Sequence, residues 1–186
     1  VADLGLDADS VIAALLHDTI EDTNATHEEV AKQFGETVAA LVEGVTKLSR
    51  VQYTSKEEEQ MENLRKMFMA MAQDIRVILI KICDRLHNMR TMEYQSPAKQ
   101  REKSLETMEI YAPIAHRLGM QKLKWELEDL SLRYLDPVGY KEIEDELAAR
   151  SSAHEEFLAA VQQRITQRMW EEGIRCKVYG RVKHTY

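Results

Sequence analysis

Hydrophobic residues recur at helical spacing along most of this 186-residue chain. The stretch 36–48 (ETVAALVEGVTKL) is the plainest case, since one helical face carries the apolar residues Val38, Leu41, Val42 and Val45. The stretch 11–22 (VIAALLHDTIED) is apolar almost throughout until its end. This pattern predicts a central, buried helix, with Asp9 or Ser10 as its N-terminal cap.

The most apolar stretch of the chain is 75–92 (IRVILIKICDRLHNMRTM). Taken alone, the run VILI at 77–80 also fits a buried strand. The length of the stretch favours a helix, because Leu86 and Met89 continue the apolar pattern at helical spacing. With only three prolines and seven glycines, the composition agrees with a mostly helical chain.

Capping residues predict where several helices begin. Thr26 and Glu29 form a capping box, which opens a short helix that Gly35 ends. A second capping box, SKEE at 55–58, opens a long helix through MENLRKMFMAMA at 61–72.

Prolines and a glycine mark the helices that follow. Pro97 begins a helix that ends at Gly119, and a kink is expected at Pro113. Leucines at helical spacing then predict a helix over 122–135 (KLKWELEDLSLRYL).

The segment LDPVGY at 135–140 is the best candidate for a domain boundary. Two polar helices are expected after it, over 138–150 and 154–171, and Gly173 ends the second one. The alternating residues IRCKVYGRVK at 174–183 predict a strand. We therefore expect an all-α first domain, followed by the first helices and strand of an α/β unit.

The net charge of −7 is spread unevenly along the chain. Residues 1–31 hold eight acidic residues and no lysine or arginine, which argues against nucleic acid as the main ligand of this region and suits a cation. The last twelve residues show the reverse, with no acid and four basic residues: Arg175, Lys177, Arg181 and Lys183.

The two cysteines, Cys83 and Cys176, lie far apart and form no CxxC pair. A disulfide framework and a zinc–thiolate site are therefore not expected, and a reducing cytoplasm is the expected location. No apolar run approaches the ~20 residues that a membrane span needs. The chain does not begin with methionine, and we expect it to be a fragment.

The end of the first long helix is the first candidate for chemistry. Six positions there hold a histidine and three acids: His17, Asp18, Glu21 and Asp22. Like charges three or four apart on a helix repel, so a bound cation would stabilise this arrangement. An imidazole with carboxylates suits Mn²⁺, Fe²⁺, Zn²⁺ or Mg²⁺. A solvated helix end is the alternative.

Asp84 is the second candidate, because an acid after a strongly apolar run is expensive to bury unless it is paired or metal-bound. Asn88 and Thr91 follow at spacings that place them on the same helical face as Asp84. The alternative is that Asp84 caps a helix or pairs with Arg85 or Arg90.

Two basic residues lie beside Asp84. Lys81 and Arg85 could contact phosphate, but a solvated helix face is the favoured interpretation for both.

Several blocks of this sequence closely resemble the Rel/SpoT proteins, the bifunctional synthetase/hydrolases of the alarmone (p)ppGpp: HDTIEDT, YTSKEEEQMENLRKM, DIRVILIKICDRLHNMRT, YAPIAHRLGM and VYGRVKHTY. Their larger class, the HD-domain phosphohydrolases, implies an all-α helical bundle with a metal held by an H…HD…D set. The resemblance implies an HD hydrolase domain at 1–136 and the truncated beginning of an α/β (p)ppGpp synthetase domain at 137–186.

The resemblance also implies roles for the hydrolase residues. His17, Asp18 and Asp84 match three metal ligands, usually for Mn²⁺. Glu21 and Asp22 match the acidic pair that positions or activates the attacking water.

Further positions match residues that bind nucleotides. Asn88 and Thr91 match positions near the bound guanine nucleotide. Arg181, Lys183 and His184 match the start of the synthetase motif that grips the phosphates of ATP, for which the metal would be Mg²⁺. A solvated strand edge is the alternative for this basic cluster.

The implied activity is metal-dependent hydrolysis of ppGpp or pppGpp to GDP or GTP and pyrophosphate. The implied protein is a bacterial, cytoplasmic protein of the stringent response that also makes (p)ppGpp from ATP and GDP or GTP. Contact with the ribosome would come through regions C-terminal to this chain. Neither a membrane nor direct DNA binding is expected.

The sequence departs from the family pattern at its start. The family has a further histidine ligand and a basic loop upstream of the HD pair, and both would fall before Val1. An incomplete hydrolase site is therefore expected, since substitution by His27, His87 or His116 is disfavoured. Two other functions stay open. A catalytically silent, regulatory HD domain of a synthetase is disfavoured by the intact acids, and another HD-family nucleotide phosphohydrolase is disfavoured by GRVKHTY.

Overall fold

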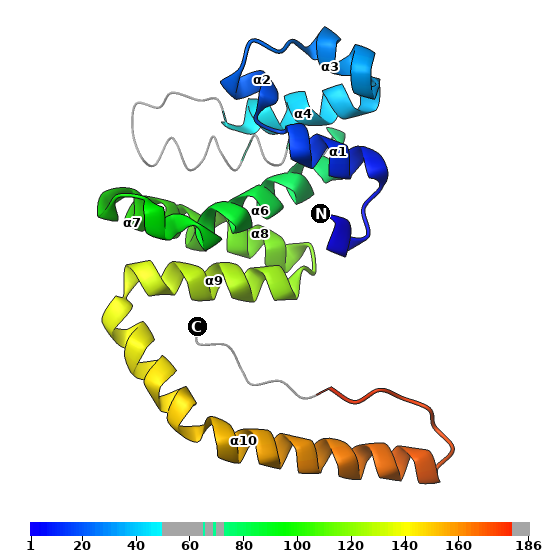
Figure 1. Cartoon of the computed structure of the whole chain (residues 1–186), viewed down its shortest axis with the longest axis vertical. Coiled ribbons are helices and arrows are strands. Elements are labelled where there is room, and N and C mark those ends of the chain that lie inside the picture. The colour runs from blue at the N-terminus through cyan, green and yellow to red at the C-terminus, as the bar shows by residue number, and fades with distance from the viewer. Residues whose placement is uncertain (50–64, 66–68, 70–72, 180–186) are drawn as a thin grey trace.

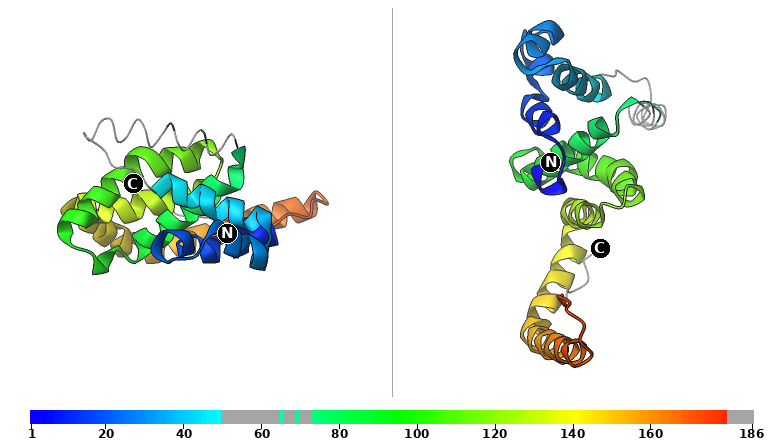
Figure 2. Two further views of the ribbon diagram at one scale, coloured as in Figure 1. Left: turned by 90° about the horizontal axis from the view of Figure 1, so that it is seen from above. Right: turned by 90° about the vertical axis from the view of Figure 1, so that its right-hand side faces the viewer.

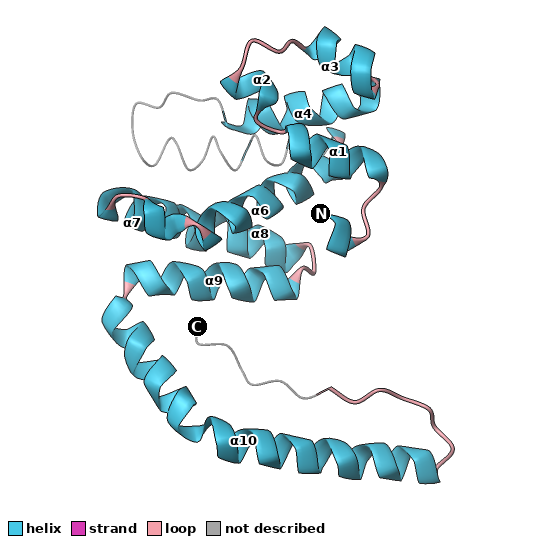
Figure 3. Ribbon diagram, viewed as in Figure 1, coloured by secondary structure: helices cyan, strands magenta, loops and turns pink. Residues whose placement is uncertain are grey.

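The described part of the chain is a stack of helices (Figure 1). The structure is a computed structural model, and it describes residues 1–49, 65, 69 and 73–179. Its elements are η1 (Ala2–Leu4), α1 (Ala8–Leu16), α2 (Thr19–Asp22), α3 (His27–Phe34), α4 (Glu36–Ser49), α6 (Ile75–Arg90), η2 (Met92–Tyr94), α7 (Pro97–Glu106), η3 (Thr107–Tyr111), α8 (Ala112–Arg117), α9 (Gln121–Leu135) and α10 (Pro137–Glu171). Figure 3 shows only helices and loops in this described part, so the expected all-α fold is confirmed.

Helix α6 lies between two hydrophobic clusters. It contributes Val77 and Ile80 to a cluster with α1, α3 and α4. To a second cluster, with η3, α8 and α9, it contributes Ile78, Ile82, Leu86 and Met89. Because α6 is buried on both sides, its sequence is apolar almost throughout. The predicted helix is confirmed, and the alternative strand at 77–80 is wrong.

Helix α1 differs from its prediction at both ends. Its N-cap is Asp7, whose side chain accepts a hydrogen bond from the Ser10 backbone, so the expected caps at residues 9 and 10 are wrong. The helix ends at Leu16, and a turn separates it from α2. The Thr19 hydroxyl donates to the Leu16 carbonyl at 2.6 Å, and the His17 ring contacts the carbonyl of Ala14. Side chains therefore form hydrogen bonds with backbone carbonyls at this helix end.

Helices α3 and α4 form as their sequences predict. The capping box of Thr26 and Glu29 is present, and Gly35 follows α3 with a positive φ of 94°. The apolar face of α4 is buried through Val38, Leu41, Val42 and Val45. The second capping box, at 55–58, lies outside the described residues, as does most of the helix predicted after it.

The helix predicted from Pro97 to Gly119 is interrupted by the π-helical turn η3. This turn ends at Tyr111, two residues before Pro113, which has no backbone N–H to continue the α-helical pattern. The structure therefore places the expected irregularity one turn earlier than the proline. Gly119 ends the segment with a φ of 76°.

The C-terminal region differs most from its prediction. Helix α10 is assigned continuously from Pro137 to Glu171, so the two expected helices are one element. Figure 1 and Figure 2 show that it extends away from the stack and bends sharply near its middle. The sequence SSA at 151–153 contains no proline or glycine that would end a helix. Residues 174–179 of the expected strand have no regular structure, and the rest of it lies outside the described residues. A strand needs a partner for its backbone groups, and the described residues offer none.

None of the helices that the structure describes is apolar over enough length to span a membrane.

Candidate metal and phosphate site

His17 meets Asp84 where the end of α1 contacts the middle of α6. The Nε2 atom of His17 lies 3.4 Å from Oδ1 of Asp84 and 3.0 Å from Oδ2 of the adjacent Asp18. The side chains of His17 and Asp84 are 22% and 11% exposed, whereas that of Asp18 is 58% exposed. Packing of α1 on α6 therefore brings the three predicted ligands together at the edge of the core.

The ring of His17 has a fixed orientation. Its Nδ1 lies 2.9 Å from the Ala14 carbonyl oxygen, which can only accept, so Nδ1 carries the proton and donates. Nε2 then faces the two carboxylates. The hydrogen bond with Asp84 raises the pKa of His17 above its ordinary value, against the effect of burial. A histidine whose second nitrogen is held by a backbone carbonyl is the usual arrangement of a metal-binding imidazole.

Asp84 is held by two further side chains of its own helix. Lys81 Nζ lies 2.8 Å from Oδ2, and the Asn88 side-chain amide donates to Oδ1 at 2.8 Å. Burial alone would raise the pKa of Asp84, but the hydrogen bond from His17 and the charge of Lys81 hold it well below its usual range. The alternative interpretation of Asp84, as a helix cap or as the partner of Arg85 or Arg90, is therefore wrong.

The other predicted residues lie around this group. Glu21 and Asp22 are exposed in the short helix α2, which begins directly after Asp18. Thr91 is the C-terminal cap of α6, and its hydroxyl donates to carbonyls of its own helix. The predicted phosphate-binding residues of the synthetase lie outside the described residues: Arg181, Lys183 and His184.

The prediction of a solvated face for Lys81 and Arg85 is wrong. Lys81 is only 13% exposed and contacts Asp84. Arg85 is buried, lies 3.0 Å from a carboxylate oxygen of Glu106 and stacks over the ring of Tyr111 at 4.2 Å. The partners of Arg85 come from α7 and η3, so the local sequence around it gives no indication of its burial. These contacts fix α6, which carries Asp84, against the second hydrophobic cluster.

The side chains around His17 fit a divalent cation by their chemistry. One imidazole nitrogen and two carboxylates form a mixed N/O donor set. His17 contacts each carboxylate directly, and among the described residues no group of three or more His, Cys, Asp or Glu side chains is placed so that it could hold a metal ion as it stands. Binding an ion would therefore replace the direct contacts of His17 with the carboxylates.

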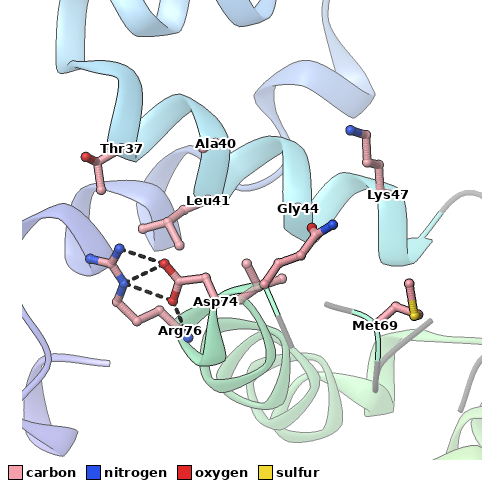
Figure 4. A pocket seen from close by; sticks show the side chains of 10 residues that line it. Thr37, Ala40, Leu41, Gly44, Lys47, Met69, Asp74 and Arg76 are labelled. Carbon is pink, nitrogen blue, oxygen red and sulfur yellow. Dashed lines mark hydrogen bonds and ion pairs between the residues drawn. The ribbon is translucent and has the colours of Figure 1, made fainter. Parts of the chain in front are cut away.

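Two cavities lie away from these residues. One, of about 460 Å³, lies between α4 and the start of α6, and Figure 4 shows its lining, which includes Leu41, Gly44 and Asp74. The other, of about 490 Å³, lies along α10 near Ile165. Neither is lined by a predicted site residue, so the candidate site rests on its side-chain chemistry and not on a large cavity.

Residues 1–121 match the HD domain family, and the chain belongs to that family. Over 186 residues, the whole of this chain, it is 48% identical to the bifunctional (p)ppGpp synthase/hydrolase SpoT of Escherichia coli (strain K12) and 49% identical to a GTP pyrophosphokinase of Streptomyces coelicolor. It is also 45% identical over 186 residues to the guanosine-3′,5′-bis(diphosphate) 3′-pyrophosphohydrolase of Haemophilus influenzae.

The chain spans about a quarter of the length of these relatives: 26%, 22% and 28% of their sequences, respectively. The resemblance to the Rel/SpoT proteins is confirmed. A phosphohydrolase of the HD family implies a divalent metal, and neither Mn²⁺ nor Mg²⁺ is specified by the similarity.

Proposed function

We propose that this chain provides the hydrolase part of a bifunctional (p)ppGpp synthase/hydrolase. Its reaction would be hydrolysis of ppGpp or pppGpp to GDP or GTP and pyrophosphate. The observation that carries the proposal is the convergence of His17, Asp18 and Asp84 from separate elements, in a chain nearly half identical to named (p)ppGpp hydrolases.

The metal of this site would be Mn²⁺, held by His17 Nε2 and the carboxylates of Asp18 and Asp84. When bound, such an ion lowers the pKa of a coordinated water and neutralises phosphate charge. The chain's own contribution to this site is orientation. The Ala14 carbonyl fixes the ring of His17, while Lys81 and Asn88 hold the carboxylate of Asp84.

Glu21 and Asp22 would serve the attacking water. Both carboxylates are exposed on α2, three and four residues after Asp18, and one of them would accept a proton from the attacking water. The water oxygen would bond to the phosphorus attached to the ribose 3′ oxygen. The bond from that phosphorus to the 3′ oxygen would break, and the 3′ oxygen would take a proton.

Asn88, in the last turn of α6, and Thr91, its C-terminal cap, would contact the nucleotide. Both side chains are exposed, as a ligand contact requires. The Asn88 amide also donates to Asp84, so the same side chain would contact both the nucleotide and a proposed metal ligand.

The division into domains is part of the proposal. Residues 1–136 would form the hydrolase domain, and residues 137–186 would begin the synthetase domain, where Arg181, Lys183 and His184 would bind ATP phosphates with Mg²⁺. The expected cytoplasmic location and contact with the ribosome stay predictions for the whole protein.

Product analysis tests this function. The full-length protein, meaning a form extended to the length of its relatives, is incubated with ppGpp and Mn²⁺, and the nucleotides are separated by anion exchange. Equal amounts of GDP and pyrophosphate are expected. Asp84→Asn should abolish the reaction, whereas Asp145→Asn, at an exposed aspartate of α10, should not change it.

Two results would overturn the proposal. Undiminished turnover by Asp84→Asn would remove this residue from the site. Mn²⁺ binding without any ppGpp turnover would instead indicate a catalytically silent, regulatory HD domain.

A further inference from the structure

One arginine joins the beginnings of the two helices that carry the proposed ligands. Asp7 is the N-cap of α1 and Asp74 is the N-cap of α6. Nη1 of Arg76 donates to Oδ2 of Asp7 at 2.7 Å, and Nη2 donates to Oδ2 of Asp74 at 2.7 Å. Nε lies 3.1 Å from both carboxylate oxygens of Asp74, and Figure 4 shows this part of the group.

Each aspartate both caps its helix and binds the guanidinium of Arg76. Oδ1 of Asp7 accepts the backbone N–H of Ser10 at 2.9 Å, which leaves Oδ2 for Arg76. Oδ1 of Asp74 accepts the backbone N–H of Arg76 itself at 2.9 Å. The bond from Arg76 to Asp7 therefore joins the start of α1 to α6, while Asp74 holds the guanidinium of Arg76 from its own helix, and we call Asp7, Asp74 and Arg76 the N-cap joint.

In both helices, the same number of residues separates the N-cap joint from the candidate site. His17 follows Asp7 by ten residues, and Asp84 follows Asp74 by ten residues. At 1.5 Å per residue, each length spans about 15 Å. Both helices run in the same direction, since they are joined at their beginnings and meet again at His17 and Asp84. Between the two ends, Ala13 and Ile80 are buried in one hydrophobic cluster.

We propose that Arg76 is a positioning residue for the metal site: the N-cap joint sets the position of α1 along α6, and thereby brings His17 to Asp84. A helix moves along its axis as a unit, so a shift of α1 at the joint also shifts His17 relative to Asp84. The inference deepens the proposed function and rests on it. Since Arg76 is partly exposed, the expected effect is moderate.

The test measures Mn²⁺ affinity and helix protection in the full-length protein. Arg76→Gln should weaken Mn²⁺ binding, followed by the EPR signal of free Mn²⁺, by about two- to tenfold. In the metal-free protein it should also speed amide hydrogen exchange in α1. The matched control is Arg90→Gln, because Arg90 of α6 pairs with Glu126 of α9 at 2.6 Å and not with α1. That control should leave Mn²⁺ affinity unchanged and speed exchange in α9.

A double-variant comparison separates positioning from general destabilisation. If Arg76 acts through Asp7, the combination of Asp7→Asn and Arg76→Gln should weaken Mn²⁺ binding no more than Arg76→Gln alone. Unchanged Mn²⁺ affinity in Arg76→Gln, with faster exchange in α1, would leave the joint a purely structural contact and overturn the inference. Failure of the unaltered protein to bind Mn²⁺ would overturn the proposed function itself, and the positioning role with it.

Discussion

The imidazole of His17 lies 3.4 Å from the carboxylate of Asp84, although α2, α3 and α4 separate these residues along the chain. The contact exists only because α1 packs on α6, and both side chains are largely shielded from solvent. In addition, Asp84 has a cation of its own helix, Lys81, at 2.8 Å. The candidate site is therefore a set of charged and polar side chains at the edge of the core, in which His17 and Lys81 both stabilise the charge of Asp84.

Replacing Lys81 by methionine should destabilise the metal-free protein. Asp84 would stay buried with less compensation for its charge, which is expected to lower the free energy of unfolding by about 1–3 kcal/mol. Urea denaturation measures this loss, and added Mn²⁺ should reduce it by supplying a new counter-charge. Lys47→Met is the control, because its ion pair with Glu43 is exposed, and it should lose at most about 0.5 kcal/mol. Equal losses for the two variants would contradict the prediction.

Arg85 should matter for stability more than any exposed arginine of α6. Arg85→Met would remove the buried partner of the Glu106 carboxylate and leave it only Lys103, at 3.1 Å, so the free energy of unfolding should fall by about 2–4 kcal/mol. Combining it with Glu106→Leu should recover part of that loss, because no buried carboxylate is then left without Arg85, and the ammonium of Lys103 is exposed enough to be solvated. Chemical denaturation of the three variants checks this, and a loss below about 1 kcal/mol for Arg85→Met would refute it.

His27 should make stability depend on pH. Its Nε2 lies 3.0 Å from Glu36 and its Nδ1 lies 3.0 Å from Glu43. The hydrogen bond with Glu36 and the nearby carboxylates, which include Glu28, raise the pKa of His27 above 6.5. A raised pKa means that the contribution is complete below about pH 6.5 and is lost as the pH rises through the folded-state value.

The loss of Tm caused by His27→Gln should consequently be larger at pH 6 than at pH 9. Thermal unfolding at both pH values measures it. In a background carrying Glu36→Gln and Glu43→Gln, the difference between the two pH values should shrink. A loss of Tm that is equal at both pH values in the native background would count against this prediction.

Gly44 should not tolerate alanine, although alanine favours helices. A Cβ at this position of α4 would lie 2.8 Å from Cγ2 of Val77 in α6. Gly44→Ala should therefore destabilise the protein by about 1–3 kcal/mol, against a gain of about 1 kcal/mol expected in an open helix. Adding Val77→Ala should relieve the contact. Denaturation curves measure whether Gly44→Ala lowers or raises the free energy of unfolding.

Features that depend on local sequence were predicted well. The capping box of Thr26 and Glu29 needs only neighbouring residues, and the apolar face of α4 follows from spacing alone. The pairing of Asp84 was also predictable, because an acid inside an apolar stretch needs a partner.

Features that depend on distant partners were missed. The burial of Arg85 depends on Glu106, and the break after Leu16 depends on side chains that occupy carbonyls at the end of an otherwise apolar helix. Arg76 gave no indication of its role, since its partner Asp7 lies far away in the sequence. Helix α10 was predicted as two helices, whereas it is one bent helix, and no proline or glycine lies between the two predicted segments.

The central claim is that His17, Asp18 and Asp84 together hold one divalent cation. The most direct measurement is diffraction from crystals of the full-length protein grown with Mn²⁺, with data collected on both sides of the manganese absorption edge. We predict an anomalous peak within coordination distance of His17 Nε2 and of both carboxylates, and its loss in Asp84→Asn crystals. A manganese peak elsewhere, or none in crystals of the active protein, would contradict the account.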